Sequence, residues 1–175
     1  RQGFETLRVI DFDRVEERNL STQPYGRADI GRSKVGVLSS VIYRSVGVDL
    51  DAVARRIEDS NSRRLLRGVD LVVDCLDNHE ARSIVTARAE RDELECLHVG
   101  LDEDYGEIIW NERYRVPGDP TNDVCDEPLS RNLVVLTATL AAEAILRFAT
   151  LGEKRDRSIT MRDLSIDSLE LQSVR

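Results

Sequence analysis

The sequence predicts an α/β fold, a Rossmann-like doubly wound and mainly parallel sheet that ends in antiparallel closing strands. Between residues 7 and 111, short β-rich runs alternate with helical stretches, a pattern typical of a parallel sheet covered by helices. Residues 69–75 form an apolar run, as expected of a buried strand. After Gly100 the pattern changes to a strand, a long Ala/Leu-rich helix and two closing strands.

The elements follow in order. The expected strands are residues 7–11, 51–57, 69–75, 95–100, 106–114, 158–164 and 166–174. The expected helices are residues 30–46, 61–67, 80–91 and 132–151. The first helix is indicated by Val35, Leu38, Ile42 and Val46 at helical spacing, and the last helix is closed by Gly152. A loop at 116–128 holds three of the four prolines.

Length and composition narrow the class of protein. With 175 residues, we expect one domain over residues 1–175. The net charge of −8, with basic residues interspersed among acids, argues against a nucleic-acid partner. No uninterrupted apolar stretch approaches the roughly 20 residues of a membrane span, so we expect no membrane partner. Three cysteines without a C-x-x-C pair favour a reducing, cytoplasmic location.

Polar residues that follow a strand's apolar run are the first candidates for a ligand site in a parallel sheet. Asp11 follows the run L-R-V-I, and an acid at such a strand end is well placed to bind both hydroxyls of a ribose. An alternative stays open, because the same aspartate could cap the turn that follows the strand. The run at 69–75 ends in the same way, with Asp77 and Asn78 just beyond it.

Two longer motifs give these strand ends a specific resemblance. Residues 11–23 read D-F-D-R-V-E-E-R-N-L-S-T-Q, residues 29–35 read D-I-G-R-S-K-V, and residues 70–78 read D-L-V-V-D-C-L-D-N with Arg82 four positions on. They resemble the patterns D-x-D-x-V-x-x-x-N-L-x-R-Q, G-x-x-K and D-x-V-x-D-C-T-D-N-x-x-x-R of the ThiF/MoeB/HesA family. This family of adenylyltransferases includes the ubiquitin-activating enzymes.

The resemblance implies a role for each matching residue. Asp11 would hold the ribose of ATP, Asn19 and Lys34 would contact the triphosphate, and Asp77 would ligate Mg²⁺. The nucleotide-binding set implied in this way is Asp11, Asp13, Asn19, Gln23, Lys34, Asp77, Asn78 and Arg82. Within it, Asn78 and Arg82 would support the strand end that carries Asp77.

The residue types suit adenylation, in which a carboxylate attacks the α-phosphate of ATP. Two anions approach each other only if cations cancel their charge, which Lys34 and a carboxylate-bound Mg²⁺ can do. Outside the motif, Lys34 would be interpreted as a solvated helix residue, and Asp77-Asn78 as a pair that caps the next helix.

The cysteines and histidines are assigned differently. Cys75 is expected to be a packed core thiol, and Cys96 is expected in the core as well. Cys125 lies where some family members carry the cysteine that takes up a thioester or persulfide, so it is a candidate catalytic residue, although acidic neighbours oppose its thiolate. His79 and His98 form neither a hydrolase triad nor a metal cage, and His79 is expected at a helix N-terminus.

The sequence departs from the family pattern at three places. The glycine-rich phosphate turn G-x-G-G-x-G is absent, so we expect it, with the first strand of the domain, before residue 1. Thr22 stands where the pattern has a phosphate-binding arginine, and Thr22 cannot make the bidentate contact of that residue. Arg18 or Arg27 would have to reach in from a neighbouring turn. The paired C-x-x-C zinc motif of the family is also missing.

Three functions are compatible with these features. The first is ATP-dependent adenylation of the C-terminal carboxylate of a ubiquitin-like or sulfur-carrier protein, and the second is a non-catalytic subunit of the same fold that binds a carrier protein or peptide. The third, an NAD-dependent dehydrogenase, begins from Asp11 but gives Asn19, Lys34 and Asp77 no role. The helix at 132–151 carries more apolar residues than one buried stripe needs, so we expect a homodimer.

Overall fold

The computed structural model describes residue 4, residues 6–118 and residues 131–169. These residues form two compact units, Arg1–Asn61 and Ser62–Arg175, and each is described by itself. The expectation of a single domain over residues 1–175 stays a prediction.

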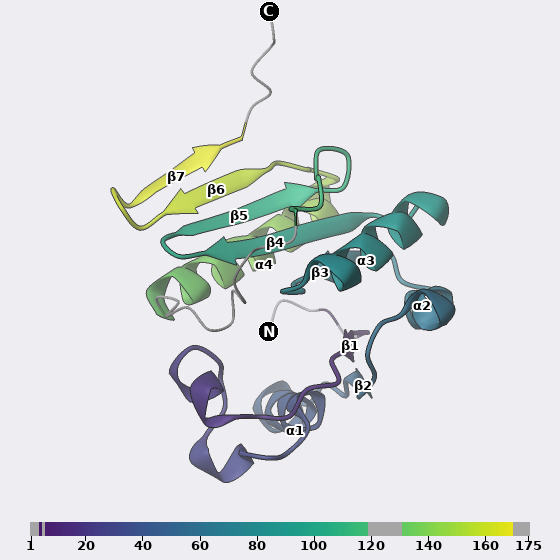
Figure 1. The fold of residues 1–175 in the computed structure, drawn as a ribbon, viewed down its shortest axis with the longest axis vertical. Helices are drawn as coiled ribbons and strands as arrows, with labels where there is room; N and C mark the ends of the chain where they lie inside the picture. Colours follow the sequence, from purple (N-terminus) through teal and green to yellow (C-terminus); the bar gives the residue numbers. More distant parts are fainter. Residues whose placement is uncertain (1–3, 5, 119–130, 170–175) are drawn as a thin grey trace, which may run out of the picture. The chain divides into compact units, whose positions relative to one another are not determined.

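The first unit contains a two-stranded parallel sheet and one long helix (Figure 1). Its elements are β1 (Arg8–Ile10), the 3-10 helices η1 (Glu17–Ser21) and η2 (Arg27–Asp29), α1 (Lys34–Val46) and β2 (Asp51–Val53). Helix α1 ends at Gly47, which adopts a left-handed conformation with φ of 74° and donates its N–H to the Tyr43 carbonyl. Val35 and Val37 of α1 are buried together with Val15.

The second unit is a five-stranded sheet in the order β3-β4-β5-β6-β7. Its elements are β3 (Val72–Asp74), α3 (His79–Arg91), β4 (Cys96–Asp102), β5 (Tyr105–Trp110), α4 (Arg131–Leu151), β6 (Arg157–Thr160) and β7 (Ser165–Ser168), while α2 (Asp59–Leu65) crosses the boundary between the units. Strands β3 and β4 are parallel, and each later strand is antiparallel to its neighbour. The predicted fold class, a mixed α/β sheet with antiparallel closing strands, is confirmed.

The core of the second unit lies between its sheet and α4 (Figure 1). Leu97 of β4, Ile108 and Trp110 of β5 and Ala141 of α4 form its buried centre. A Cβ atom on Gly106 would stand 2.5 Å from Oγ1 of Thr137, so glycine is what allows β5 to approach α4 so closely. Because side chains alternate along a strand, the residues between these core positions point to the opposite face of the sheet.

Helix α4 has two different sides. Leu133, Thr137 and Ala141 are buried on one side, whereas Val135 on the opposite side is 54% exposed. Leu151, the last residue of the helix, is 70% exposed. By length and composition α4 is apolar enough to cross a membrane, with a mean hydropathy of 1.7. This is weak evidence for a span, because a helix that packs on β4, β5 and β6 also needs apolar residues. The expectation of no membrane partner therefore stays a prediction.

The strands predicted at 51–57, 69–75 and 106–114 are longer than the observed β2, β3 and β5. The strand expected at 69–75 is the shorter β3, and Cys75 lies just beyond it as an exposed residue rather than in the core. The reason is local, because the Asp74 side chain accepts a hydrogen bond from the Leu76 N–H and turns the chain out of the sheet at this point. Desolvation by the surrounding protein still raises the pKa of the Cys75 thiol to about 11, as expected of an unreactive cysteine. Cys96, by contrast, is fully buried in β4 as predicted, and burial raises the pKa of its thiol.

Candidate functional site

One candidate site is the carboxyl end of β1, in the first unit. Oδ1 of Asp11 accepts a hydrogen bond from the backbone N–H of Asp13 at 2.7 Å, and the N–H of Asp11 donates to the Val53 carbonyl at 3.2 Å. The turn-capping alternative for Asp11 is therefore realised. This does not remove the residue from a ribose-binding role, since a carboxylate has two oxygens and several acceptor positions.

Lys34 is held at this strand end from two directions. Its backbone N–H donates to the Asp13 carbonyl at 2.9 Å, and its Nζ donates to Oδ2 of Asp13, also at 2.9 Å. Burial by itself would lower the pKa of the amine, but the hydrogen bond and charge of Asp13, with the charge of Asp11, raise it above its usual value. The side chain of Lys34 is only 13% exposed, so it is not a solvated helix residue but a fixed cation beside two carboxylates.

The segment between Asp13 and Lys34 is built around Asn19. This residue is 8% exposed, its Oδ1 accepts a hydrogen bond from the Glu16 N–H at 2.9 Å, and its carbonyl accepts one from the Gln23 N–H at 2.9 Å. Asn19 thus shapes the turn that carries Thr22 and Gln23. The phosphate contact of Asn19 and the nucleotide contact of Gln23 stay predictions.

Arg18 and Arg27, the two arginines expected to reach toward the site of Thr22, both lie on the surface of the first unit, and their contact with phosphate stays a prediction. Nε of Arg18 pairs with Glu16 at 2.7 Å, and this arginine is largely exposed. Arg27 begins η2 on the surface of the same unit.

Tyr25 is a neighbour of this strand end that sequence reasoning missed. Burial and then the negative charge of Asp11 raise the pKa of its hydroxyl, which also senses Lys34. The backbone N–H of Tyr25 donates to the Gln23 carbonyl at 2.9 Å, so a tight turn brings the ring back toward Asp11. No motif marks this position, and only the turn after Gln23 and Pro24 could have suggested it.

A separate candidate site is the carboxyl end of β3, which belongs to the second unit. Here Asp77 and Asn78 are both exposed, and Nδ2 of Asn78 donates to Oδ1 of Asp77 at 3.2 Å. Oδ1 of Asn78 accepts a hydrogen bond from the Ala81 N–H at 2.9 Å, so Asn78 is the N-cap of α3. The capping alternative is therefore correct for Asn78, while the metal role of Asp77 stays a prediction.

Arg82 supports this strand end from α3, as the resemblance implies. Its guanidinium donates to Oδ2 of Asp74 at 3.3 Å, to the Tyr114 hydroxyl at 3.0 Å and to the Val99 carbonyl at 2.9 Å. The side chain of Arg82 is 12% exposed and that of Asp74 is fully buried. Arg82 is thus a structural cation of the second unit, with its donors directed at protein atoms.

The remaining predicted residues lie elsewhere or outside the described residues. His79 begins α3, as expected, and its Nδ1 donates to the Pro117 carbonyl at 2.7 Å. Cys125 falls outside the described residues.

The position of Asp77 suits a Mg²⁺ ion that is held together with a bound substrate. Among the described residues, no group of three or more His, Cys, Asp and Glu side chains could hold a metal ion. Magnesium in nucleotide enzymes is usually held by one or two carboxylates together with substrate phosphates and water. The exposed carboxylate of Asp77 fits such a substrate-bridged ion and does not fit a cage made of protein alone.

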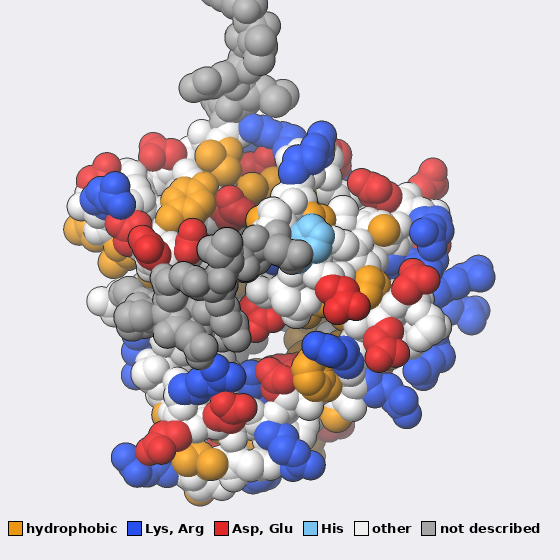
Figure 2. Space-filling view, in the orientation of Figure 1, with side chains coloured by type: hydrophobic (Ala, Val, Ile, Leu, Met, Phe, Trp, Pro, Cys, Tyr) orange, Lys and Arg blue, Asp and Glu red, His pale blue; other side chains and the backbone are white. Residues whose placement is uncertain are grey.

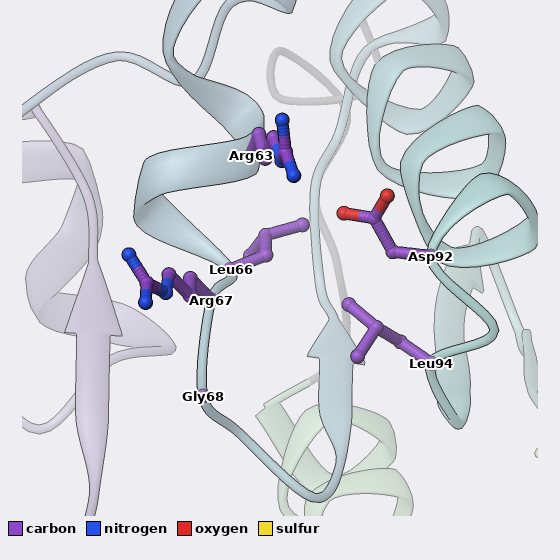
Figure 3. Close-up of a pocket in the computed structure, with 6 residues that line it drawn as sticks. All are labelled: Arg63, Leu66, Arg67, Gly68, Asp92 and Leu94. Carbon is purple, nitrogen blue, oxygen red and sulfur yellow. The ribbon is translucent and has the colours of Figure 1, made fainter.

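One small pocket of about 220 Å³ lies in the second unit (Figure 3). It is lined by Arg63, Leu66, Arg67, Gly68, Asp92 and Leu94. Gly68 precedes β3 and Leu94 precedes β4, so the pocket lies at the amino ends of these two strands. Ligands of such sheets bind beyond the carboxyl ends, so this pocket is not part of the candidate site.

Figure 2 shows basic and acidic side chains mixed over one face of the molecule. On that face, the distribution agrees with the mixed charges of the sequence.

The sequence is similar to one family model and to several known proteins. The model of the ThiF family matches residues 1–162. A probable adenylyltransferase/sulfurtransferase MoeZ of Mycobacterium tuberculosis is 34% identical over 89 residues, which cover 50% of this chain and 23% of that protein. The ubiquitin-like modifier-activating enzyme 5 of Oryza sativa subsp. japonica is 26% identical over 161 residues, 83% of this chain and 37% of that protein. The chain thus spans less than half the length of these relatives.

Solved structures show the same fold. SeMet PaaA has a TM-score of 0.75 at 16% identity, over 96% of this chain and 65% of that chain. E. coli MccB, solved with ATP, has a TM-score of 0.76 at 18% identity, over 95% of this chain and 56% of that chain. With a family match over most of its length and the family motifs at two strand ends, this chain belongs to the ThiF family.

Proposed function

We propose that this protein uses ATP and Mg²⁺ to adenylate the C-terminal carboxylate of a ubiquitin-like or sulfur-carrier protein. The observation that carries the proposal is the position of Lys34, a largely buried cation held beside Asp11 and Asp13 at the end of β1. The adenylyltransferases among the relatives support the reaction class, and their names include both a sulfurtransferase and a ubiquitin-like modifier-activating enzyme.

In the proposed reaction, a carboxylate oxygen of the carrier attacks the α-phosphorus of ATP. A bond forms between that oxygen and phosphorus, and the bond from the α-phosphorus to the bridging oxygen of the β-phosphate breaks. Pyrophosphate leaves with the electron pair, and an acyl-adenylate remains. The ammonium of Lys34 offsets the charge of the phosphates, which lets the second anion approach.

Asp11 and Asp77 have separate tasks in this proposal. Asp11 would accept hydrogen bonds from the ribose, and Asp77 would hold Mg²⁺ through its carboxylate. When bound, the ion supplies Lewis-acid stabilisation of the pyrophosphate leaving group. The ion pair of Lys34 with Asp13 exchanges for an ion pair with phosphate when ATP binds, and this exchange is inexpensive because Asp13 is 44% exposed.

The proposal is tested by carrier-dependent exchange of labelled pyrophosphate into ATP, measured on the full-length protein. Lys34→Met should lower the exchange rate by about 100-fold or more, the usual loss for removing one charge-stabilising donor. The matched control is Arg44→Met, which removes an exposed cation from the same helix α1 and should leave the rate unchanged. Wild-type protein that shows no exchange with any carrier would contradict the proposal.

A second function is favoured by one specific observation, the neutral Thr22 at the position of a phosphate-binding arginine. The second candidate is a non-catalytic subunit that binds a carrier protein or peptide. It predicts weak ATP binding by the wild-type protein, because the bidentate contact is missing.

Titration of ATP into wild-type protein and Thr22→Arg separates the two candidates. A gain in affinity of tenfold or more would favour the non-catalytic subunit, because it reveals a site that lacks one essential contact. The matched control is Ser21→Arg, which adds the same charge at the neighbouring exposed position. Tight binding by wild-type protein, with less than a twofold gain from Thr22→Arg, favours the enzyme.

We also propose that two copies of the chain associate through the exposed side of α4 that carries Val135. Light scattering during size-exclusion chromatography tests this association. Val135→Glu should convert a dimer to a monomer, while Ser40→Glu at an exposed position of α1 serves as the comparison and should leave the dimer intact.

A further inference from the structure

A buried polar cluster stands behind the segment that carries Asp77. His98 of β4 is 1% exposed and its Nδ1 lies 2.7 Å from Oδ2 of the fully buried Asp74. The ring of Tyr114 stacks on His98 at a centroid distance of 3.6 Å and an interplanar angle of 6°. Arg82 donates to both Asp74 and Tyr114, which closes the cluster. These side chains belong to the second unit and lie on the face of the sheet opposite α4.

Asp74 connects this cluster to the backbone beyond β3. One carboxylate oxygen, Oδ2, accepts from His98 and Arg82, and the other, Oδ1, accepts from the N–H of Leu76 at 2.9 Å. Leu76 directly precedes Asp77. The orientation of the Asp74 carboxylate therefore fixes the start of the segment 75–78. Two side chains fix this orientation, and the hydrogen bond from His98 is shorter than the one from Arg82.

The protonation pattern of His98 follows from the same contacts. Asp74 faces the cation Arg82, so it is an acceptor, and Nδ1 of His98 is the donor in their hydrogen bond. Nε2 is buried and has no hydrogen-bond partner among the described residues. The carboxylate of Asp74 therefore receives hydrogen bonds from both side chains.

Packing alone does not require this cluster. Apolar side chains of similar volume usually fill such a space at equal or better stability, because taking charges out of water is costly. A buried polar cluster that reaches the backbone of a ligand-binding segment has another use, since it limits the segment to one conformation.

We propose that His98 is a positioning residue, which acts through Asp74 to hold the segment 75–78 in the conformation that presents Asp77 to a Mg²⁺ ion bound with ATP. This inference rests on the proposed function for its metal, but its structural part can be tested without ATP. Sequence reasoning missed His98 because a lone histidine in a strand has no motif.

Hydrogen-deuterium exchange of the full-length protein without nucleotide tests the structural part. His98→Leu should raise exchange at least tenfold at the Leu76 amide, with little change in peptides of β5 and β6. His98→Asn should restore most of the protection, because the Asn amide nitrogen is as many bonds from Cα as Nδ1 is. Unchanged exchange at Leu76 in His98→Leu, or an equal rise throughout the second unit, would overturn the proposal.

Titration with ATP in the presence and absence of Mg²⁺ tests the functional part. His98→Leu should weaken the magnesium-dependent affinity by about tenfold or more, as expected when the support of a metal ligand is lost, and should change affinity without Mg²⁺ by less than twofold. The control is Ser62→Ala, which removes the 3.1 Å hydrogen bond to the buried Arg88 elsewhere in the unit.

The outcomes separate the two proposals. If wild-type protein fails to bind ATP, the proposed function fails, and the positioning of segment 75–78 is still decided by the exchange experiment. If wild-type protein binds ATP with Mg²⁺ but His98→Leu behaves as Ser62→Ala does, only the positioning role of His98 is contradicted.

Discussion

The chain makes the same kind of aspartate turn after β1 and at the end of β3, but the side-chain contacts around the two turns differ. At each end an aspartate accepts the N–H of the residue two positions on, Asp11 from Asp13 at 2.7 Å and Asp74 from Leu76 at 2.9 Å. Beyond β1, the cation Lys34 pairs with a carboxylate that is 44% exposed. At β3, the aspartate itself is fully buried between Arg82 and His98.

This difference suits the two strand ends to different tasks. A partly exposed ion pair can exchange one partner for a phosphate, because water already screens it and little is lost when it opens. A buried carboxylate with two side-chain donors cannot exchange them without leaving a charge unpaired. The end of β1 is therefore suited to receive ligand charge, and the end of β3 is suited to fix the geometry of the chain that follows.

The largest expected effect is the loss of Asp74. Asp74→Ala leaves the buried guanidinium of Arg82 without its anion and should lower the free energy of unfolding of the second unit by about 3–5 kcal/mol. The fluorescence of Trp110, the one tryptophan of the chain, reports on this unit during urea unfolding.

The comparison variant is Asp11→Ala, whose urea unfolding is measured by circular dichroism. It removes the corresponding turn at β1, where the side chain is only partly buried, and should cost about 1 kcal/mol. Similar losses for Asp11→Ala and Asp74→Ala would break the distinction between the two strand ends.

The second effect concerns the cap of α3. Asn78→Ala removes the 2.9 Å hydrogen bond to the Ala81 N–H and should cost about 1 kcal/mol. Asn78→Asp keeps an acceptor at the helix N-terminus and should cost much less, as measured by urea unfolding. Equal losses for the two variants would show that the amide of Asn78, through its contact with Asp77, matters more than the cap.

The sequence predicted the fold class and most elements because periodicity and turn residues are local signals. It placed the α3 helix, which begins at His79, within one residue, and it named Arg82 as a support. It could not find the partners of Arg82, since His98 and Tyr114 are brought to Asp74 only by strand pairing and packing. The same limit explains Cys75, which an apolar run places in a strand but which the Asp74 turn directs outward.

At the β1 end, sequence reasoning could predict residue types but not their pairing. The motif marked Asp11, Asp13 and Lys34 as a set, and the structure shows that Lys34 pairs with Asp13. That choice depends on the turn geometry of residues 14–33, which returns the chain to the strand end through the backbone contact of Lys34 with Asp13.

The third effect is the coupling of Lys34 with Asp13. A double-mutant cycle of Lys34→Met and Asp13→Asn should give a coupling energy of about 0.5–1 kcal/mol at low salt, decreasing as salt is added. Thermal unfolding at two ionic strengths measures it. A coupling energy above about 3 kcal/mol, independent of salt, would mean that Lys34 is as rigidly held as Arg82 and is poorly suited to exchange its partner.

The smallest effect tests where the β3 cluster ends. Glu107 of β5 is half-buried near Arg82 and His98, and burial raises the pKa of its carboxyl despite the attraction of these two residues. A raised folded pKa means that the carboxyl favours folding most below its unfolded pKa of about 4.3, and that this advantage is lost as the pH rises through the folded pKa. Glu107→Gln should therefore stabilise the protein at pH 7, by about 0.5 kcal/mol or less because the group is partly screened by water, and should have no effect near pH 3. Urea unfolding at both pH values measures the difference. If Glu107→Gln destabilises the protein at pH 7, then Glu107 is a further anion of the Asp74 cluster, and the geometry at the end of β3 depends on β5 as well as on β4 and α3.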